Sequence, residues 1–368
     1  MQIQAKSDLD NFRDQVARFM SGKSPTTEVR RLMATDTGYD VGVWQQLCGE
    51  LGLAGIAIPE SYGGFGFGPV ELGIVAEQMG RHLYCGPFFA SAVMAAGALL
   101  MGGSEKAREA LLPGIAAGTT IATLVLENVG NLERPDQCFQ TSGGNTSRLS
   151  GQAPIVLDAG IADLLLVMTG TADTAVLYAI DPGAQGVEIR SRQSLDETRK
   201  LSSISLDEVL ADRVGSFDAS QLAQLWDYLS AILAREMMGG AQVLMDSTVE
   251  YTRLRYQFGR PIGSFQGLKH RCADQLMELE LAKAATEQAC VWLAGGEGEA
   301  CLASMAKAMA SDAYMNTARM AIQLRGGIGF TWEDDTHLWF KRAKSAEVFL
   351  GSPQIHRERM MRMMEKQP

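Results

Sequence analysis

The sequence has few aromatic residues and no cluster of basic residues longer than a pair. Aromatic side chains make up 7% of the 368 residues, whereas hydrophobic residues reach 46% and methionine occurs 19 times. This balance favours helices packed on helices, with methionine filling irregular gaps, over a β-barrel. A formal net charge of −10 without any basic run excludes nucleic-acid binding as the main activity.

The usual spacings of metal sites and disulfide frameworks are also missing. The six cysteines include no C-x-x-C pair, and the four histidines lie far from them in the sequence. We therefore expect reduced thiols and no metal site. The cysteines are Cys48, Cys85, Cys138, Cys272, Cys290 and Cys301, and the histidines are His82, His270, His337 and His356.

No apolar stretch approaches the length of about 18 to 20 residues that a membrane-spanning helix needs. The first 20 residues are amphipathic and mixed in charge, unlike a secretory or transit peptide. We expect a cytoplasmic protein without a membrane span. No repeat of 20 to 50 residues is present, which excludes a solenoid.

The length exceeds that of a usual single core, so two or three domains are expected. Apolar residues recur every three or four positions between residues 8 and 116, as in Phe12, Val16 and Phe19. That spacing predicts amphipathic helices interrupted by turns rich in glycine and proline. We predict an N-terminal α-helical domain over residues 1–117.

The pattern changes twice further along the chain. Short runs typical of strands, separated by Gly, Asp and Pro, occupy residues 121–126, 164–168 and 175–180. Long helical patterns then return over residues 222–256, 265–294 and 300–324. We predict a β middle domain over residues 118–216 and a C-terminal helical bundle over residues 217–368, so the fold is mainly α with a β middle domain.

A glycine- and proline-containing turn at residues 255–266 separates the first two long helical patterns. Its ordinary interpretation is helix capping, with Gly259 and Ser264 as caps and Pro261 as a helix breaker. Capping does not explain Arg255, Phe258 and Gln266, whose charge, ring and amide suit a phosphate-bearing cofactor. The alternative is that Arg255 is a solvated loop residue.

A second glycine-rich turn, at residues 323–330, follows the third long helical pattern. It is not G-x-G-x-x-G after a strand, which excludes a Rossmann dinucleotide site there. Its two adjacent glycines, Gly326 and Gly327, exceed what one helix cap requires. They predict a close approach of the backbone by a ligand or by another chain.

Four segments together resemble the acyl-CoA dehydrogenase family in order, spacing and total length. They are residues 51–64, 255–266, 323–330 and 349–355. The resemblance implies an N-terminal helical domain, a β-barrel-like middle domain and a C-terminal four-helix bundle. It also implies FAD as cofactor, oxidation of an acyl-CoA thioester to the 2,3-enoyl-CoA, and an electron-transfer acceptor.

The resemblance also implies two sets of FAD-binding residues. The residues that match positions holding the FAD of the neighbouring subunit are Arg255, Phe258, Gln266, Gln323 and Gly327. Ser352 and Gln354 match residues that contact the adenosine end of FAD in their own subunit. All of these side chains except Phe258 and the glycine can bond to phosphate or ribose oxygens.

Leu350 stands where the family carries its catalytic carboxylate, and Leu229 holds the alternative base position. The segments at residues 126–131 and 156–160 lack the family's tryptophan and hydroxyl contacts to the flavin ring. An ionised Asp158 beside the flavin would oppose its anionic reduced form by about 4 kcal/mol at an effective dielectric constant near 20.

Three hypotheses follow from these losses. We favour the base-lacking subunit of a hetero-oligomeric (α2β2) acyl-CoA dehydrogenase, which completes the FAD site of a homologous, base-bearing partner. The second hypothesis is a self-sufficient homo-oligomer whose base is a displaced carboxylate, for which the candidates are Asp227, Glu236 and Asp158. The third is a non-enzymatic scaffold with the same fold.

Overall fold

The computed structural model describes residues 6–130, 139–142 and 147–365, and the chain forms two compact units. The first unit contains the residues up to 29, residues 73–84 and the residues from 230 onward. The second contains residues 30–72 and 85–229. In the described part of the chain, the first unit is helical except for one short hairpin, and the second holds a seven-stranded sheet.

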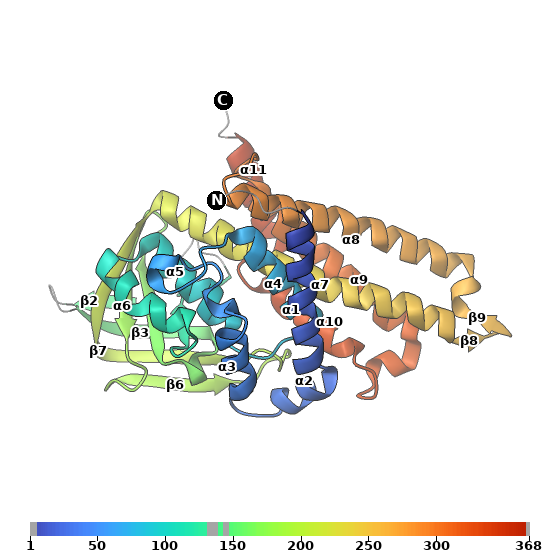
Figure 1. Ribbon diagram of the computed structural model, residues 1–368, viewed down its shortest axis with the longest axis horizontal. Helices are drawn as coiled ribbons and strands as arrows, with labels where there is room; N and C mark the ends of the chain where they lie inside the picture. Colours follow the sequence, from blue (N-terminus) through green and yellow to red (C-terminus); the bar gives the residue numbers. More distant parts are fainter. Residues whose placement is uncertain (1–5, 131–138, 143–146, 366–368) are drawn as a thin grey trace. The chain divides into compact units, whose positions relative to one another are not determined.

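Long helices form the first unit (Figure 1). They are α1 (Lys6–Lys23), the later part of α4 (Pro69–Arg81), the later part of α7 (Ala219–Leu254), α8 (Gln266–Leu293), α9 (Leu302–Arg325), α10 (Thr336–Val348) and α11 (Pro353–Glu365). Helix α9 packs against α8, α10 and α11. Its buried face is rich in alanine, and Gly240 of α7 lies where a Cβ would meet the hydroxyl of Tyr314 on α9. Small residues therefore let the helices approach closely.

The connection from α7 to α8 is a β-hairpin of β8 (Tyr256–Gln257) and β9 (Arg260–Pro261), followed by the 3-10 turn η5 (Ile262–Ser264). Phe258 and Gly259 form its two-residue turn with φ values of 55° and 75°. Positive φ at both central residues is what a tight hairpin turn requires. The predicted capping roles are wrong: α7 ends before Gly259, and Ser264 Oγ donates to the Pro261 carbonyl, 2.7 Å away, while Phe265 occupies the N-cap position.

The sheet of the second unit runs in the order β1-β4-β5-β7-β3-β2, and β6 also pairs with β7. Only β1 and β4 are parallel to each other among the strand pairs of the described residues. The strands are β1 (Ala122–Val125), β2 (Phe139–Ser142), β3 (Ser147–Leu157), β4 (Leu164–Gly170), β5 (Thr174–Ile180), β6 (Val187–Arg192) and β7 (Leu201–Asp218). The 18-residue β7 pairs with β3 and β6 through its first part and with β5 through its last part.

Short helices complete the second unit. They are the later part of α2 (Thr26–Met33), α3 (Val41–Gly49), η1 (Leu53–Gly55), η2 (Glu60–Tyr62), the start of α4, the π-helix η3 (Phe89–Ala95), α5 (Ala96–Gly102), α6 (Glu105–Ala116) and η4 (Ala159–Ile161). In the segment 51–64, a Cβ on Gly64 would lie 2.1 Å from the Ile58 carbonyl oxygen. That glycine is therefore required by packing within the segment.

The predicted fold class, mainly α with a β middle domain, is confirmed. The three long helical patterns correspond to α7, α8 and α9, and the three strand-like runs correspond to β1, β4 and β5. The domain boundaries at residues 117 and 216 stay a prediction. None of the described helices is long and apolar enough to cross a membrane.

Candidate functional site

The β8–β9 hairpin follows the end of α7 (Figure 1), and both Arg255, just before it, and Phe258, in its turn, are exposed. Phe258 is 90% exposed and contacts only the edge of the Phe265 ring among the described aromatic pairs, with centroids 6.1 Å apart. The guanidinium of Arg260 lies 4.0 Å from the centroid of the same Phe265 ring. The exposed Arg255 side chain has no hydrogen bond or ion pair to any described residue. A cation and an aromatic ring are thus both presented to an outside ligand.

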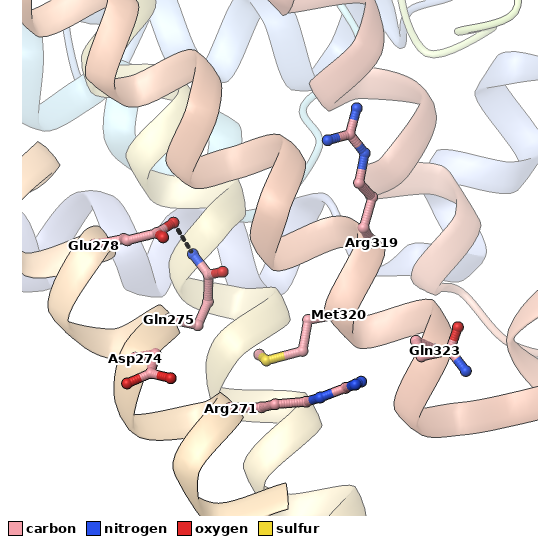
Figure 2. Close-up of a pocket in the computed structure, with 7 residues that line it drawn as sticks. All are labelled: Arg271, Asp274, Gln275, Glu278, Arg319, Met320 and Gln323. Atoms are coloured by element: carbon pink, nitrogen blue, oxygen red, sulfur yellow. Dashed lines mark hydrogen bonds between the residues drawn. The ribbon is translucent and has the colours of Figure 1, made fainter. Parts of the chain in front are cut away.

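Gln266 and Gln323 are exposed on the two helices that follow the hairpin. Gln266 is the first residue of α8, and Gln323 lies near the end of α9, where it lines a groove of about 350 Å³ between the two helices. In Figure 2, Arg271 extends from α8 toward α9, where Met320 and Gln323 lie. This groove therefore combines an amide and a guanidinium, both able to donate hydrogen bonds.

The part of the same groove around Glu278 is a hydrogen-bonded network. The Gln275 amide donates to Glu278 Oε2 and to the Ala313 carbonyl, each at 3.3 Å, as Figure 2 shows for the first of these bonds. Asn316 donates to the same Glu278 oxygen at 3.1 Å. The Gln275 and Asn316 amides are thus engaged within the chain, whereas the Arg271 and Gln323 side chains make no hydrogen bond to any described residue.

The turn η6 (Gly326–Phe330) begins where α9 ends. Gly326 has φ +65° and ends the helix, whereas Gly327 has no positive φ. A Cβ at Gly327 would meet nothing within 4 Å. Nothing within the described chain therefore requires glycine at position 327, which is consistent with close approach by an external group.

Leu350 follows α10 and is completely buried, with φ +58°. Its carbonyl lies 2.8 Å from His356 Nε2, and the neighbouring Gly351 carbonyl accepts a hydrogen bond from Lys307 Nζ at 3.1 Å. Burial lowers the pKa of Lys307 to about 7. Burial and the Lys307 charge lower the pKa of His356 to about 3, so the neutral ring donates from Nε2. The turn at the base position is thus held from two helices while its side chain is apolar.

Ser352 and Gln354 lie at the start of α11. Ser352 is half-buried, and its hydroxyl accepts a hydrogen bond from the Ile355 N–H at 3.4 Å. Gln354 is exposed. The contacts of Ser352 and Gln354 to FAD stay a prediction.

The candidate carboxylates for a displaced base are all buried. Leu229 and Asp227 lie on α7, and Leu229 is completely buried. Its assignment to the alternative base position stays a prediction. Glu236 accepts a hydrogen bond from Arg342 at 2.7 Å within a buried ion pair. The Glu236 carboxylate is thus engaged by Arg342 within the chain.

In the second unit, Asp158 follows β3 with φ +52° and donates its N–H to the Lys200 carbonyl at 2.9 Å. Glu127 is buried and accepts a hydrogen bond from the Phe139 N–H at 3.1 Å. Asn131, the last residue of the predicted segment 126–131, lies outside the described residues. No group of three or more potential metal ligands occurs among the described residues.

Three features of this region were not predicted from the sequence. Arg271 was missed because a single arginine within a helical pattern gives no signal. Arg325 belongs to the glycine-rich turn at residues 323–330, but its buried hydrogen bonds are made to residues of α7, so its role was not predicted. Lys307 bonds to the Gly351 carbonyl, 44 positions further along the chain, which no local pattern reveals.

Comparisons with known proteins cover both ends of the chain. Residues 6–119 match the acyl-CoA dehydrogenase N-terminal domain, and residues 230–365 match the acyl-CoA dehydrogenase C-terminal domain. Acyl-CoA dehydrogenase IpdE2 of Mycobacterium tuberculosis is 33% identical over 345 residues, which make up 93% of this chain and 92% of that protein.

Two solved structures match almost the whole chain. The ChsE4–ChsE5 complex from Mycobacterium tuberculosis matches with a TM-score of 0.90 and 26% identity, covering 100% of both chains. A variant of the Tcur3481–Tcur3483 steroid ACAD matches with a TM-score of 0.89 and 27% identity, covering 98% of each chain. Each of these assemblies is named for two different chains.

Proposed function

This chain belongs to the acyl-CoA dehydrogenase family of CH–CH oxidoreductases, and we propose that it is a base-lacking subunit that completes the FAD site of a base-bearing partner. The observation that carries this proposal is an asymmetry. The residues that match neighbour-directed positions of the family are exposed, whereas Leu350, at the position expected for the base, is buried.

The neighbour-directed residues suit FAD by their chemistry. Arg255 supplies a cation for a pyrophosphate, Gln323 and Gln266 supply amides for hydroxyl or ring atoms, and Phe258 supplies an exposed ring. The open space above Gly327 suits a cofactor that lies against the backbone. When bound, FAD accepts the hydride that leaves the β-carbon of the thioester.

The missing chemistry concerns the proton on the α-carbon. A positioned carboxylate normally removes that proton, and Leu350 and Leu229 have no group that accepts one. Glu236 is occupied by Arg342. We infer that the carboxylate comes from the partner, and that this chain binds and orients the cofactor used with it.

The two-chain relatives support this division of labour. ChsE4–ChsE5 and Tcur3481–Tcur3483 are complexes of two named chains, and this chain covers nearly all of the chains that it matches. The Tcur3481–Tcur3483 complex is a steroid ACAD. Steroid acyl-CoA thioesters therefore belong beside linear and branched thioesters in the substrate panel.

The proposal is tested by activity of the purified chain alone and of the chain purified with a family member that has a carboxylate at the base position. Turnover of acyl-CoA thioesters is followed with an artificial electron acceptor. We expect activity in the complex only, and loss of that activity when the partner's carboxylate is replaced by the corresponding amide. Turnover by this chain alone would favour the homo-oligomer with a displaced base. A complex that binds neither FAD nor thioester would favour the scaffold.

A further inference from the structure

Arg325 is a buried arginine at the last position of α9, immediately before the exposed turn η6. Its Nη1 donates to Thr248 Oγ1 at 2.9 Å, and its Nη2 donates to Ser247 Oγ at 3.0 Å, both on α7. Its Nε lies 3.2 Å from Asp334 Oδ2, beyond the turn. One planar guanidinium thus joins the ends of two helices to the segment that follows η6.

The same side chain also contacts the part of α7 that leads to the hairpin. The Arg325 guanidinium carbon lies 5.4 Å from the centroid of the Tyr251 ring, and the Tyr251 hydroxyl is 3.5 Å from the Arg325 carbonyl. Tyr251 lies one helical turn before Arg255, whose N–H donates to the Tyr251 carbonyl at 2.9 Å. Arg325 therefore links the stretch of α7 that leads to Arg255 with the end of α9, which carries Gln323 and precedes Gly327.

The turn η6 has few contacts at its start. A Cβ at Gly326 or at Gly327 would meet nothing within 4 Å, so the first two residues of η6 are not packed against described side chains. Asp334, the partner of Arg325, also accepts a hydrogen bond from the Thr336 N–H at 2.7 Å at the start of α10. The Arg325–Asp334 pair thus ties both ends of this loop to the bundle.

We propose that Arg325 is a positioning residue for cofactor binding: it aligns the hairpin end of α7, which carries Arg255, with the turn that carries Gln323 and Gly327. This inference rests on the proposed function, in which those residues bind the FAD of a partner subunit. Arg325 itself is buried and acts through the two exposed segments. The plain alternative is that Arg325 only stabilises the bundle.

The test uses Arg325→Met, which keeps the unbranched apolar part of the side chain but removes its donors, and the milder Asp334→Asn. Asparagine keeps the oxygen that accepts from the Thr336 N–H but loses the charge that pairs with Arg325. Arg357→Met is a matched control, because Arg357 pairs with Asp312 at a different place on α9. Met20→Ala, at a buried site on α1, controls for loss of stability alone.

Two measurements distinguish a role of Arg325 in positioning the two segments from a role in stability alone. Backbone hydrogen exchange of residues 323–335 in the chain by itself reports the loop, and we expect faster exchange in Arg325→Met and Asp334→Asn than in either control. FAD dissociation from the complex with the base-bearing partner reports the consequence. We expect about tenfold weaker FAD binding in Arg325→Met, falling to less than about threefold when Arg255 is already alanine, since coupled residues are not additive.

Each outcome distinguishes this inference from the proposed function. Faster exchange with unchanged FAD affinity, or full additivity with Arg255→Ala, would assign Arg325 to stability alone. Unchanged exchange in both variants would refute the alignment itself. Absence of FAD from the wild-type complex would instead refute the proposed function, whatever the exchange data show.

Discussion

Leu350 combines a left-handed backbone with a completely buried apolar side chain. A leucine in this conformation is unfavourable by about 1 to 2 kcal/mol, so its surroundings must impose it. Hydrogen bonds from Lys307 and His356 to the carbonyls of Gly351 and Leu350 provide that constraint. The position predicted for the base is thus an ordered turn with an apolar side chain.

Restoring the base alone should not restore activity. We expect Leu350→Glu to leave the isolated chain inactive toward acyl-CoA thioesters, because the resemblance implies that contacts to the flavin ring are missing as well. The buried carboxylate should also lower the free energy of unfolding and have a raised pKa. Leu350→Gln, which is similar in size but uncharged, controls for the polar atoms. Robust turnover of Leu350→Glu with an artificial electron acceptor would show that position 350 was the only defect.

The lowered pKa of Lys307 predicts that the stability of the fold increases with pH. Its pKa of about 7 in the fold lies below the ordinary 10.5, so above pH 7 the unfolded chain binds more protons at this site. The free energy of unfolding should therefore rise with pH, by up to about 1.4 kcal/mol per pH unit. The cost of the buried charge is fully present below pH 7.

Denaturant unfolding between pH 7 and 8.5 measures this effect in the wild type and in Lys307→Met. The window ends before the buried thiols of Cys48 and Cys290 contribute, whose pKa values burial raises to about 12. The variant should lack the rise. Equal pH slopes in the two proteins would show that Lys307 stays charged in the fold across this range.

Substitution of Arg255 tests its predicted contact to the FAD pyrophosphate. If Arg255 binds the FAD pyrophosphate, Arg255→Ala should weaken FAD binding by the assembled complex by roughly 10- to 100-fold, the value of a charge-assisted hydrogen bond. Arg253→Ala is the control, because Arg253 is exposed near the end of the same helix and lies 3.8 Å from Glu250. Unchanged FAD affinity in Arg255→Ala would mean that Arg255 is a solvated residue.

At the scale of elements, η6 permits a paired test of its two glycines. Gly327→Ala meets no atom within 4 Å and needs no positive φ, so we expect unchanged or slightly higher stability. In the complex, its methyl group should obstruct the cofactor and weaken FAD binding. Gly326→Ala should instead destabilise the fold, because φ is +65° there.

Thermal unfolding of the two variants and FAD titration of their complexes check this pair. Full FAD affinity in Gly327→Ala would show that no ligand approaches this part of the backbone. Destabilisation of Gly327→Ala would show that the turn has contacts within the chain that its open space does not indicate.

The sequence predicted those elements whose signal is long and local. Helices α7, α8 and α9 have sustained helical periodicity, and β1, β4 and β5 are short apolar runs. Strand β7 was missed because charged residues such as Asp207 and Glu208 interrupt its alternation, and its three pairings arise only in the sheet. Gly259 was assigned to a helix cap because a positive φ serves a cap and a hairpin turn equally.

The candidate site was predictable only where residues carry recognisable motifs. Arg255, Phe258, Gln266, Gln323 and Gly327 are exposed in the structure, as residues that serve another chain should be. The buried side chains that fix the positions of these segments could not be predicted from the sequence. Arg325 depends on Ser247 and Asp334, and Lys307 depends on Gly351, so their roles follow from packing between helices.

At the scale of the whole molecule, the proposed function divides the residues of this chain into those that serve its own site and those that serve the FAD site of a partner. Large exposed apolar side chains occur on the hairpin, on α8 and around η6, for example Tyr256, Met277 and Phe330. Such a surface is typical of a subunit interface. We therefore expect the chain to form at least a dimer when it is purified alone.

The FAD content of the purified protein, measured by flavin absorbance after gel filtration, tests the central claim most directly. The chain alone should form an oligomer that retains far less than about one FAD per chain, and the complex with a base-bearing partner should retain about one FAD per pair of chains. A yellow oligomer of this chain alone, with about one FAD per chain, would contradict the account and favour a self-sufficient flavoenzyme.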